Sequence, residues 1–261
     1  MMNVLSNDAE TLLWQAVGCG FARLFQGAAG FDLVKVPGGM LAMTGAAAPD
    51  LNCGAVWASP DAAAATRALA AALGRRGLPG ILLVADSAGA DAHSAAAEVG
   101  LIAAARMPLM TLLPGPIGVD VGFTTRQATS PSDLLASNRV TAAAFDLPVA
   151  LLDEVFGAGL LDAGDVTVEL VLDGDEPVGS LQTTSFGTLV GVWSMATPPA
   201  QRRRGIARAG LSHVLSRRFR TGASQAFLVA TDAGRPLYDA VGFEVVGWCT
   251  AWVGSSAGGS G

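Results

Sequence analysis

The feature that most constrains the fold of this chain is a strand, a short basic loop and a helix in direct succession in its second half. An apolar run at 189–196 predicts the strand, and a kink at Pro198-Pro199 follows it. Apolar side chains then recur at helical spacing, at Ile206, Gly210, Leu211, Val214, Leu215 and Phe219. They predict a helix over 203–220. The sequence thus places Arg202-Arg203-Arg204-Gly205-Ile206-Ala207 at the junction of the loop and the helix.

This junction has the chemistry of a phosphate site. The first turn of a helix carries unpaired backbone N–H groups at the positive end of the helix dipole, where anions bind. Gly205 permits backbone dihedral angles that a larger residue resists, and Ala207 leaves room for close approach. The alternative is an ordinary helix start with solvated arginines.

The spacing Arg202-x-x-Gly205-x-Ala207 resembles the acyl-CoA loop of the GNAT N-acetyltransferases, which is written Q/R-x-x-G-x-G/A. A second motif follows in the order that the family has. The family pattern Leu-Tyr-x-x-x-Gly-Phe-x-x-Val-Gly matches residues 237–247 at every fixed position. The resemblance covers residues 119–253.

The rest of the second half fits this resemblance. The patterns predict strands at 122–126, 166–172, 177–184 and 226–230, and helices at 132–145, 148–156 and 233–240, before a final strand. This order resembles that of the GNAT fold. It implies an α/β (α+β) fold in which a mixed, mainly antiparallel sheet is flanked by helices.

The two halves of the chain resemble each other weakly. Residues 81–86 resemble 227–232, and 98–102 align with 240–244. Each half contains, in the same order, a strand (55–58 and 189–196), a helix (61–75 and 203–220), a second strand, a second helix, a Val-Gly pair and a third strand. Internal similarity of this kind indicates a repeated unit, although short α/β segments also resemble one another by chance.

The first half lacks the chemical features of the second. Its helix starts at Ser59-Pro60-Asp61, which offers a good N-cap and an acid that repels a pyrophosphate. Ala96 aligns with Tyr238. The resemblance therefore implies a tandem GNAT protein with a degenerate N-terminal GNAT-like domain at 1–115, a catalytic domain at 116–253 and a flexible tail at 254–261, with the boundary near Pro114–Gly118.

The resemblance also implies the residues that bind acetyl-CoA. Val192 to Thr197 are expected to line the pantetheine arm through backbone groups, and the basic loop is expected to bind the pyrophosphate. The cofactor-binding residues are then Met195, Ala196, Thr197, Arg202, Arg203, Arg204, Gly205, Ile206, Ala207 and Arg208. The alternative for the strand residues is an ordinary buried strand.

Tyr238 is the only tyrosine in the chain, and in the family the tyrosine at this place gives a proton to the coenzyme A thiolate. A phenol suits this role because it is neutral at pH 7, with an ordinary pKa of about 10. The alternative is a ring that packs beside Leu237 and Phe243.

A general base is not evident, because the strand before the loop contains no carboxylate. Water held by the backbone and Ser194 could take the proton, or the amine could arrive already neutral. Asp232 is a reserve candidate, but an N-cap role for the 233–240 helix is favoured, and His213 is expected to be structural. Three large aromatic residues either line an acceptor pocket or, as is more common, belong to the core: Trp193, Trp248 and Trp252.

Composition excludes several other classes. The chain has 261 residues, of which 51% are hydrophobic. Its net charge of −6 disfavours nucleic acid as a partner. No apolar run is long enough to span a membrane, and no secretory signal is expected. The three cysteines, Cys19, Cys53 and Cys249, fit buried thiols in a reducing compartment. His93 and His213 have no ligand-spaced neighbours, so we expect no metal site.

These observations and the resemblance predict a cytoplasmic N-acetyltransferase that transfers the acyl group of acetyl-CoA directly to the amine of a small molecule or peptide. The first alternative is transfer of a longer acyl group. The second is an acyl-CoA-binding or partner-binding module without catalysis, which the missing carboxylate favours and Tyr238 opposes. The acceptor and the oligomeric state stay open.

Overall fold

The computed structural model describes residues 6–118 and 122–254, so the expected flexible tail lies outside the described residues apart from Gly254. The chain forms two compact units that exchange segments. The first unit contains the chain up to Met110 together with 229–231 and the segment from Val245 onward. The second unit contains Thr111–Leu228 and Asp232–Glu244. The domain division at 115/116 stays a prediction.

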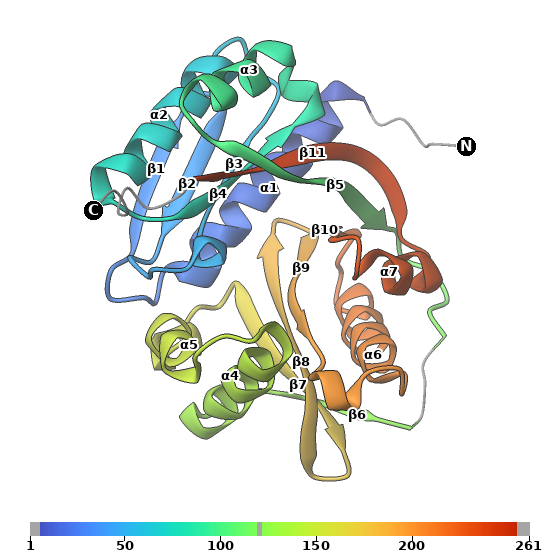
Figure 1. The fold of residues 1–261 in the computed structure, drawn as a ribbon. Coiled ribbons are helices and arrows are strands. Elements are labelled where there is room, and N and C mark those ends of the chain that lie inside the picture. The colour runs from blue at the N-terminus through green and yellow to red at the C-terminus, as the bar shows by residue number, and fades with distance from the viewer. Residues whose placement is uncertain (1–5, 119–121, 255–261) are drawn as a thin grey trace. The chain divides into compact units, whose positions relative to one another are not determined.

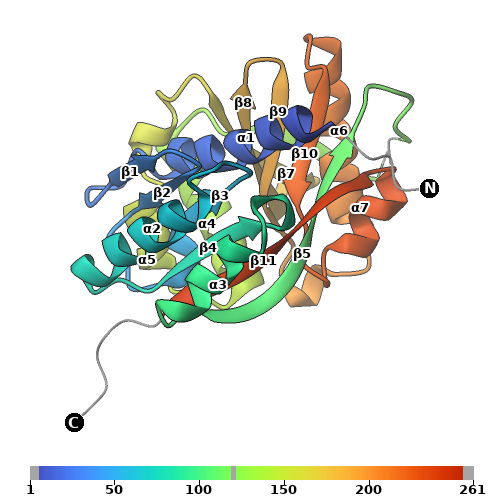
Figure 2. The same cartoon turned by 90° about the horizontal axis from the view of Figure 1, so that it is seen from above.

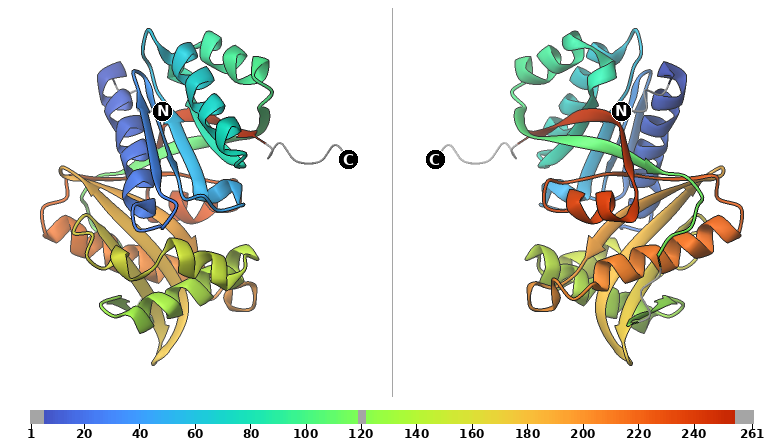
Figure 3. Two further views of the ribbon diagram at one scale, coloured as in Figure 1. Left: turned by 90° about the vertical axis from the view of Figure 1, so that its left-hand side faces the viewer. Right: turned by 90° about the vertical axis from the view of Figure 1, so that its right-hand side faces the viewer.

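The first unit is an open sheet with helices on both faces. Its elements are α1 (Asn7–Phe25), β1 (Asp32–Val36), β2 (Gly39–Met43), β3 (Asn52–Val56), α2 (Ala62–Arg76), β4 (Gly80–Ala85), α3 (Ala90–Glu98), β5 (Ile102–Leu112) and β11 (Glu244–Gly254). The strand order is β1-β2-β3-β4-β11-β5; β3 and β4 are parallel, and the β1–β2, β2–β3 and β4–β11 pairs are antiparallel. Figures 2 and 3 show α1 on one face of this sheet and α2 and α3 on the other.

The sequence patterns did not predict α1, β1 and β2, although local signals for them exist. Ser6 caps α1 by accepting a hydrogen bond from the N–H of Ala9, and Asp8 and Glu10 lie in the first turn, where the helix dipole favours acids. The β1–β2 hairpin closes through a turn in which Gly38 has φ +83°, a conformation that glycine adopts readily.

The second unit has the same architecture (Figure 1). Its elements are β6 (Thr124–Gln127), α4 (Pro131–Phe145), α5 (Val149–Val155), β7 (Val166–Asp173), β8 (Glu176–Phe186), β9 (Leu189–Ala196), α6 (Ile206–Arg220), β10 (Gln225–Val229) and α7 (Arg235–Val241). The strand order is β10-β9-β8-β7-β6, with β9 and β10 parallel and the other pairs antiparallel. The predicted mixed, mainly antiparallel sheet with flanking helices is confirmed.

One succession of elements occurs twice along the chain. In the first unit β3, α2, β4, α3 and β5 follow one another, and β9, α6, β10, α7 and β11 do so later in the chain. In each series the first two strands are parallel neighbours. The second helix of each series is followed by a left-handed glycine, Gly100 with φ +81° and Gly242 with φ +104°. The weak sequence similarity therefore corresponds to a shared local fold.

Three expectations about helix starts are corrected. Helix α6 begins at Ile206 rather than 203, because the positive φ angles of Arg203 and Gly205 interrupt helical geometry before it. Asp232 does not cap α7: its N-cap residue is Gly234, which provides no side chain. The N-cap residue of α2 is Asp61, whose side chain makes no capping bond, whereas Ser59 Oγ accepts the N–H of Asp61.

Within the two described ranges, no helix combines the length and the apolar character that a bilayer crossing requires.

Candidate cofactor site

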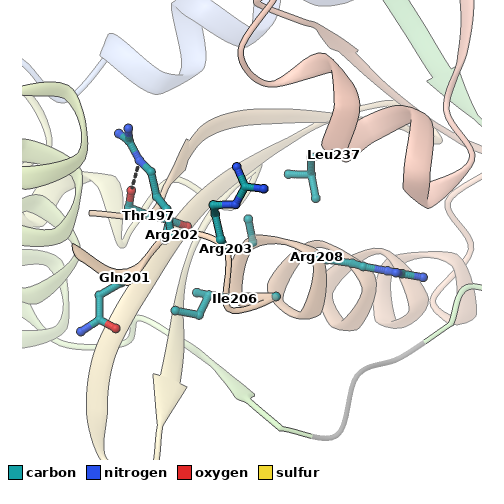
Figure 4. Close-up of a pocket in the computed structure, with 9 residues that line it drawn as sticks. Thr197, Gln201, Arg202, Arg203, Ile206, Arg208 and Leu237 are labelled. Atoms are coloured by element: carbon teal, nitrogen blue, oxygen red, sulfur yellow. Dashed lines mark hydrogen bonds between the residues drawn. The ribbon is translucent and has the colours of Figure 1, made fainter. Parts of the chain in front are cut away.

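A cavity of about 220 Å³ lies at the N-terminal end of α6, within the second unit. Figure 4 shows it between the β9–α6 loop, the first turn of α6 and α7. Its lining residues are Thr197, Gln201, Arg202, Arg203, Gly205, Ile206, Ala207, Arg208 and Leu237. Eight of these nine belong to the segment 197–208, so the predicted phosphate loop forms most of the cavity wall.

The backbone of the loop leaves donors at the cavity. The loop passes through a short 3-10 helix at Pro199–Gln201 and then takes positive φ at Arg203 (+65°) and Gly205 (+86°). Ala209 makes the first backbone hydrogen bond of α6, to the carbonyl oxygen of Gly205. The N–H groups that precede it in the first turn have no acceptor within the helix, so they can bind an anion.

The four arginines of the loop have different environments. Arg202 donates from Nε to the carbonyl oxygen of Thr197 at 3.2 Å and from Nη2 to that of Ala144 at 3.0 Å. Arg204 forms an ion pair with Asp173 at 2.7 Å. Arg203 and Arg208 are exposed, and neither has an ion-pair or hydrogen-bond partner among the residues that the structure describes. Arg203 and Arg208 therefore supply the uncompensated positive charge of this cavity.

The strand before the loop is irregular where the resemblance implies free backbone groups. The β8–β9 register shifts between the pairs Ser180↔Ala196 and Gln182↔Trp193, so β9 carries an extra residue there. Ser194, inside this bulge, has φ +47°. The pairing of β9 with β10 runs as far as Phe227↔Gly191. Residues 192–197 thus follow the last paired row of β9 and β10.

The predicted pantetheine residues lie at the end of this segment. Met195 is half-buried, Ala196 is buried, and Thr197 lines the cavity. The hydroxyl oxygen of Thr197 is buried and has no hydrogen-bond partner among the described residues. No pattern in the sequence indicates this unpaired hydroxyl, because its burial depends on how the loop folds.

Tyr238 lies on α7, next to the cavity residue Leu237. Its ring packs edge-on against Phe243, with ring centroids 5.8 Å apart, so the packing that the sequence left as an alternative is present. Burial raises the pKa of Tyr238 to about 12, which keeps the phenol protonated at neutral pH.

Other candidates named from the sequence make local contacts. Trp193 donates from Nε1 to Thr184 Oγ1 at 2.8 Å, and its ring meets Phe227 edge-on. In the first unit, Trp252 donates to His93 Nδ1 at 3.3 Å, and the guanidinium of Arg106 lies over the Trp248 ring. His213 is half-buried within α6, and Asp232 is exposed.

No group of three or more His, Cys, Asp or Glu side chains within 6–118 and 122–254 is arranged to hold a metal ion. Cys53 and Cys249 are buried free thiols, and burial raises the pKa of each above its ordinary value.

Comparison with known proteins agrees with this geometry. The acetyltransferase (GNAT) family model matches residues 141–243, which include β9, the basic loop, α6 and α7. A GCN5-related N-acetyltransferase from Kribbella flavida has a similar structure at 17% identity, with a TM-score of 0.69 over 95% of this chain and 96% of that one. No curated protein matches the sequence.

Two further solved structures share the fold. A GCN5-related N-acetyltransferase from Sphaerobacter thermophilus has a TM-score of 0.60 at 16% identity, over 86% of this chain and 82% of that one. A tandem GNAT protein from the clavulanic acid biosynthesis pathway has a TM-score of 0.56 at 11% identity, over 98% of each chain. Residues 141–243 thus form a domain of the GNAT acetyltransferase family, and the resemblance found in the sequence is confirmed.

Proposed function

We propose that this protein is an N-acetyltransferase that transfers the acetyl group of acetyl-CoA directly to an amine. The observation that carries the proposal is the cavity at the start of α6. It is lined by first-turn N–H groups without an acceptor in the helix and by Arg203, which has no ion-pair or hydrogen-bond partner among the described residues. The family of the domain at 141–243 is one of acetyltransferases, which supports acyl transfer in general. The choice of acetyl as the acyl group and of an amine as the acceptor belongs to the proposal.

The residues at the cavity fit acetyl-CoA. First-turn N–H groups of α6 and the charge of Arg203 suit its phosphates, and the end of β9 offers backbone groups for its pantetheine arm. When bound, acetyl-CoA would supply the activated acyl carbon for attack by the amine.

The protein's contribution to the chemistry would centre on Tyr238. Its phenol holds a proton at neutral pH and would donate it to the sulfur as the carbon–sulfur bond breaks. The β9 segment Leu189–Ala196 carries no carboxylate, so the proton of the amine would leave through water beside Ser194. Neither cavity nor loop presents a cysteine nucleophile, which favours direct transfer over a covalent intermediate.

The missing carboxylate also favours a second candidate function. A module that binds acyl-CoA or a partner without catalysis would keep the cavity and need no base. A longer acyl group is a further variant of the first proposal. The half-buried Tyr238 next to Leu237 favours catalysis over the binding module.

The first half is proposed to be a degenerate copy without a cofactor site. The N-cap residue of α2 is Asp61, an acid at the place where α6 has Gly205, and its negative charge would repel a phosphate. We further propose a cytoplasmic location, an amine-bearing small molecule or peptide as acceptor, and no role for nucleic acid or metal.

Two measurements on the full chain test the function. Calorimetry with coenzyme A tests the cofactor site, and release of free thiol from acetyl-CoA in a panel of amines tests transfer. Binding with amine-dependent thiol release supports the enzyme. Tight binding without thiol release in any amine supports the acyl-CoA-binding module. Absence of coenzyme A binding contradicts both the enzyme and the acyl-CoA-binding module, and leaves only the partner-binding module.

A further inference from the structure

A second cavity, of about 210 Å³, lies between α4 and α5, two neighbouring helices of the second unit (Figure 1). It shares no lining residue with the cavity at the start of α6. Four apolar residues and two polar ones make up most of its wall: Pro131, Leu134, Leu135 and Phe156, with Asn138 and Asp153. The cavity therefore combines apolar walls with one ionisable side chain, that of Asp153.

Asn138 fixes the polar end of this cavity. Its side chain is 2% exposed, and Nδ2 donates to Asp153 Oδ1 at 2.9 Å. The same nitrogen lies 3.4 Å from the carbonyl oxygen of Leu152 and 3.3 Å from that of Phe156. These bonds join α4 to the end of α5. A buried amide with several acceptors has one favoured orientation, so the Asp153 carboxylate is held in place at the cavity.

The protein uses only part of the Asp153 carboxylate. Oδ1 accepts the bond from Asn138, whereas Oδ2 has no hydrogen-bond partner among the described residues and remains accessible. Within the same described ranges, no cationic side chain pairs with Asp153. Asp133, at the start of α4, instead forms an ion pair with Arg126 at 2.7 Å. Asp153 is thus a half-buried acid whose charge the protein leaves uncompensated, and a bound cation would compensate it.

The apolar walls indicate what this cation carries. Leu134 and Phe156 are buried, whereas Leu135 is 39% exposed beside the cavity. Small-molecule sites are mostly apolar and orient the ligand through a few polar groups. A short alkyl chain would cover Leu135 while its charged end meets Asp153. A bare metal ion would leave the apolar walls without a contact.

We propose that the cavity between α4 and α5 binds a primary ammonium group carried on a short alkyl chain. Asp153 accepts a hydrogen bond from the ammonium, and Leu135 and Phe156 contact the chain. The site is separate from the proposed cofactor site and does not depend on it. Asn138 lies six residues before Ala144, the α4 residue that Arg202 contacts, and six residues span about 9 Å of helix.

The test is a titration of the isotope-labelled full chain with n-butylammonium, followed by NMR. Signals of α4 and α5, including the side-chain amide of Asn138, should shift and saturate with a Kd on the order of 1–10 mM. n-Butanol has the same chain without the charge and should bind at least about 10-fold more weakly. Equal binding of the two, or no shift in α4 and α5 at about 100 mM n-butylammonium, would refute the site.

Asp153→Asn tests the charge. It keeps the side-chain shape and an oxygen for the bond from Asn138, so it should raise the Kd for n-butylammonium at least about 10-fold and leave that for n-butanol unchanged. Glu154→Gln is the matched control, because Glu154 is exposed on the same helix and does not line the cavity. Its Kd should stay within about 2-fold of the original. Equal losses in both variants would indicate general attraction to an acidic surface.

Leu135→Ser tests the apolar wall at an exposed position, where the fold depends little on the side chain. It should weaken binding of n-butylammonium and leave methylammonium, which has no chain to cover Leu135, within about 2-fold. The location of the shifts is a further check. Shifts in the first turn of α6 instead of α4 and α5 would place the cation in the other cavity and overturn the proposal.

Discussion

Glu169 on β7 accepts a hydrogen bond from Arg217 on α6, and the Glu169 side chain has no exposed surface. Its second carboxylate oxygen is buried without a partner among the described residues. Burial raises the pKa of Glu169 above its ordinary value, although Arg217 and Arg218 oppose this shift. The folded protein therefore holds a proton at Glu169 more tightly than the unfolded chain does.

This relationship predicts how stability depends on pH. Because the folded pKa is raised, the contribution of Glu169 to the free energy of unfolding increases as pH falls from neutral towards its ordinary value of 4.5, and is lost as pH rises again through the raised pKa. Glu169→Gln should lack this dependence. Urea unfolding of both proteins from pH 5 to 8 measures it, and a difference that stays constant over this range would contradict the prediction.

Gly205→Val should weaken binding of coenzyme A at least about 10-fold, because a β-branched residue resists the +86° φ angle on which the loop depends. Gly222→Val is the matched control. Gly222, just after α6, has φ +103°, and a Cβ atom there would meet nothing within 4 Å, so the control incurs similar strain away from the cavity. The control should lose stability and keep its affinity, and equal affinities in both variants would remove the loop from the cofactor site.

Arg203→Gln should raise the Kd for coenzyme A by about 2- to 5-fold, since an exposed charge contributes modestly beside backbone donors. The Kd of this variant should also respond less to added salt. Arg220, at the other end of α6, is exposed and provides the matched control Arg220→Gln. Identical salt responses in the two variants would show that Arg203 does not contact the anion.

The titration of Tyr238 can be followed directly, because it is the only tyrosine. The folded protein should develop tyrosinate absorbance with a midpoint near pH 12, against 10.0 for an ordinary tyrosine. Stability contributed by the neutral phenol is present below pH 10 and is lost as pH rises towards 12. Unfolding in urea at a pH between these values should produce tyrosinate at once. A folded-state midpoint near 10 would show that the phenol is exposed to water.

Tyr238→Phe should lower kcat for amine acetylation by roughly 10²-fold, the usual effect of removing a positioned general acid. The phenylalanine ring can keep the edge-on contact with Phe243, so stability and the Kd for coenzyme A should change little. The loss should appear in kcat rather than KM, since the proton is needed only as the thiolate leaves. An unchanged kcat with an amine acceptor would assign Tyr238 to packing alone.

The sequence predicted the repeated strand–helix–strand elements and the basic loop well, because both rest on local signals. Apolar periodicity marks β9 and α6, and the arginine–glycine pattern marks the junction between them. The strands predicted at 166–172 and 177–184 form the hairpin of β7 and β8, and Gly174 between them has a positive φ angle that suits a tight turn.

Features that depend on distant contacts were not predictable in this way. Two arginines of the loop have protein partners that are distant in sequence: Arg202 donates to the carbonyl oxygen of Ala144, and Arg204 pairs with Asp173. The sequence therefore could not show which arginines of the loop would stay unpaired. Asp232 was favoured as an N-cap, but the helix starts two residues later than that role requires. The burial of Glu169 on β7 likewise follows from its contact with Arg217 on α6, which is distant in sequence.

The exchange of segments between the two units has a consequence for biosynthesis. Strand β11 lies between β4 and β5 in the sheet of the first unit, yet it is translated after every other strand of that sheet. During synthesis on the ribosome, the sheet of the first unit therefore lacks β11 until the whole of the second unit has also been translated. A nascent chain released early, or a gene cut at the predicted boundary, leaves exposed strand edges open to pairing with other chains.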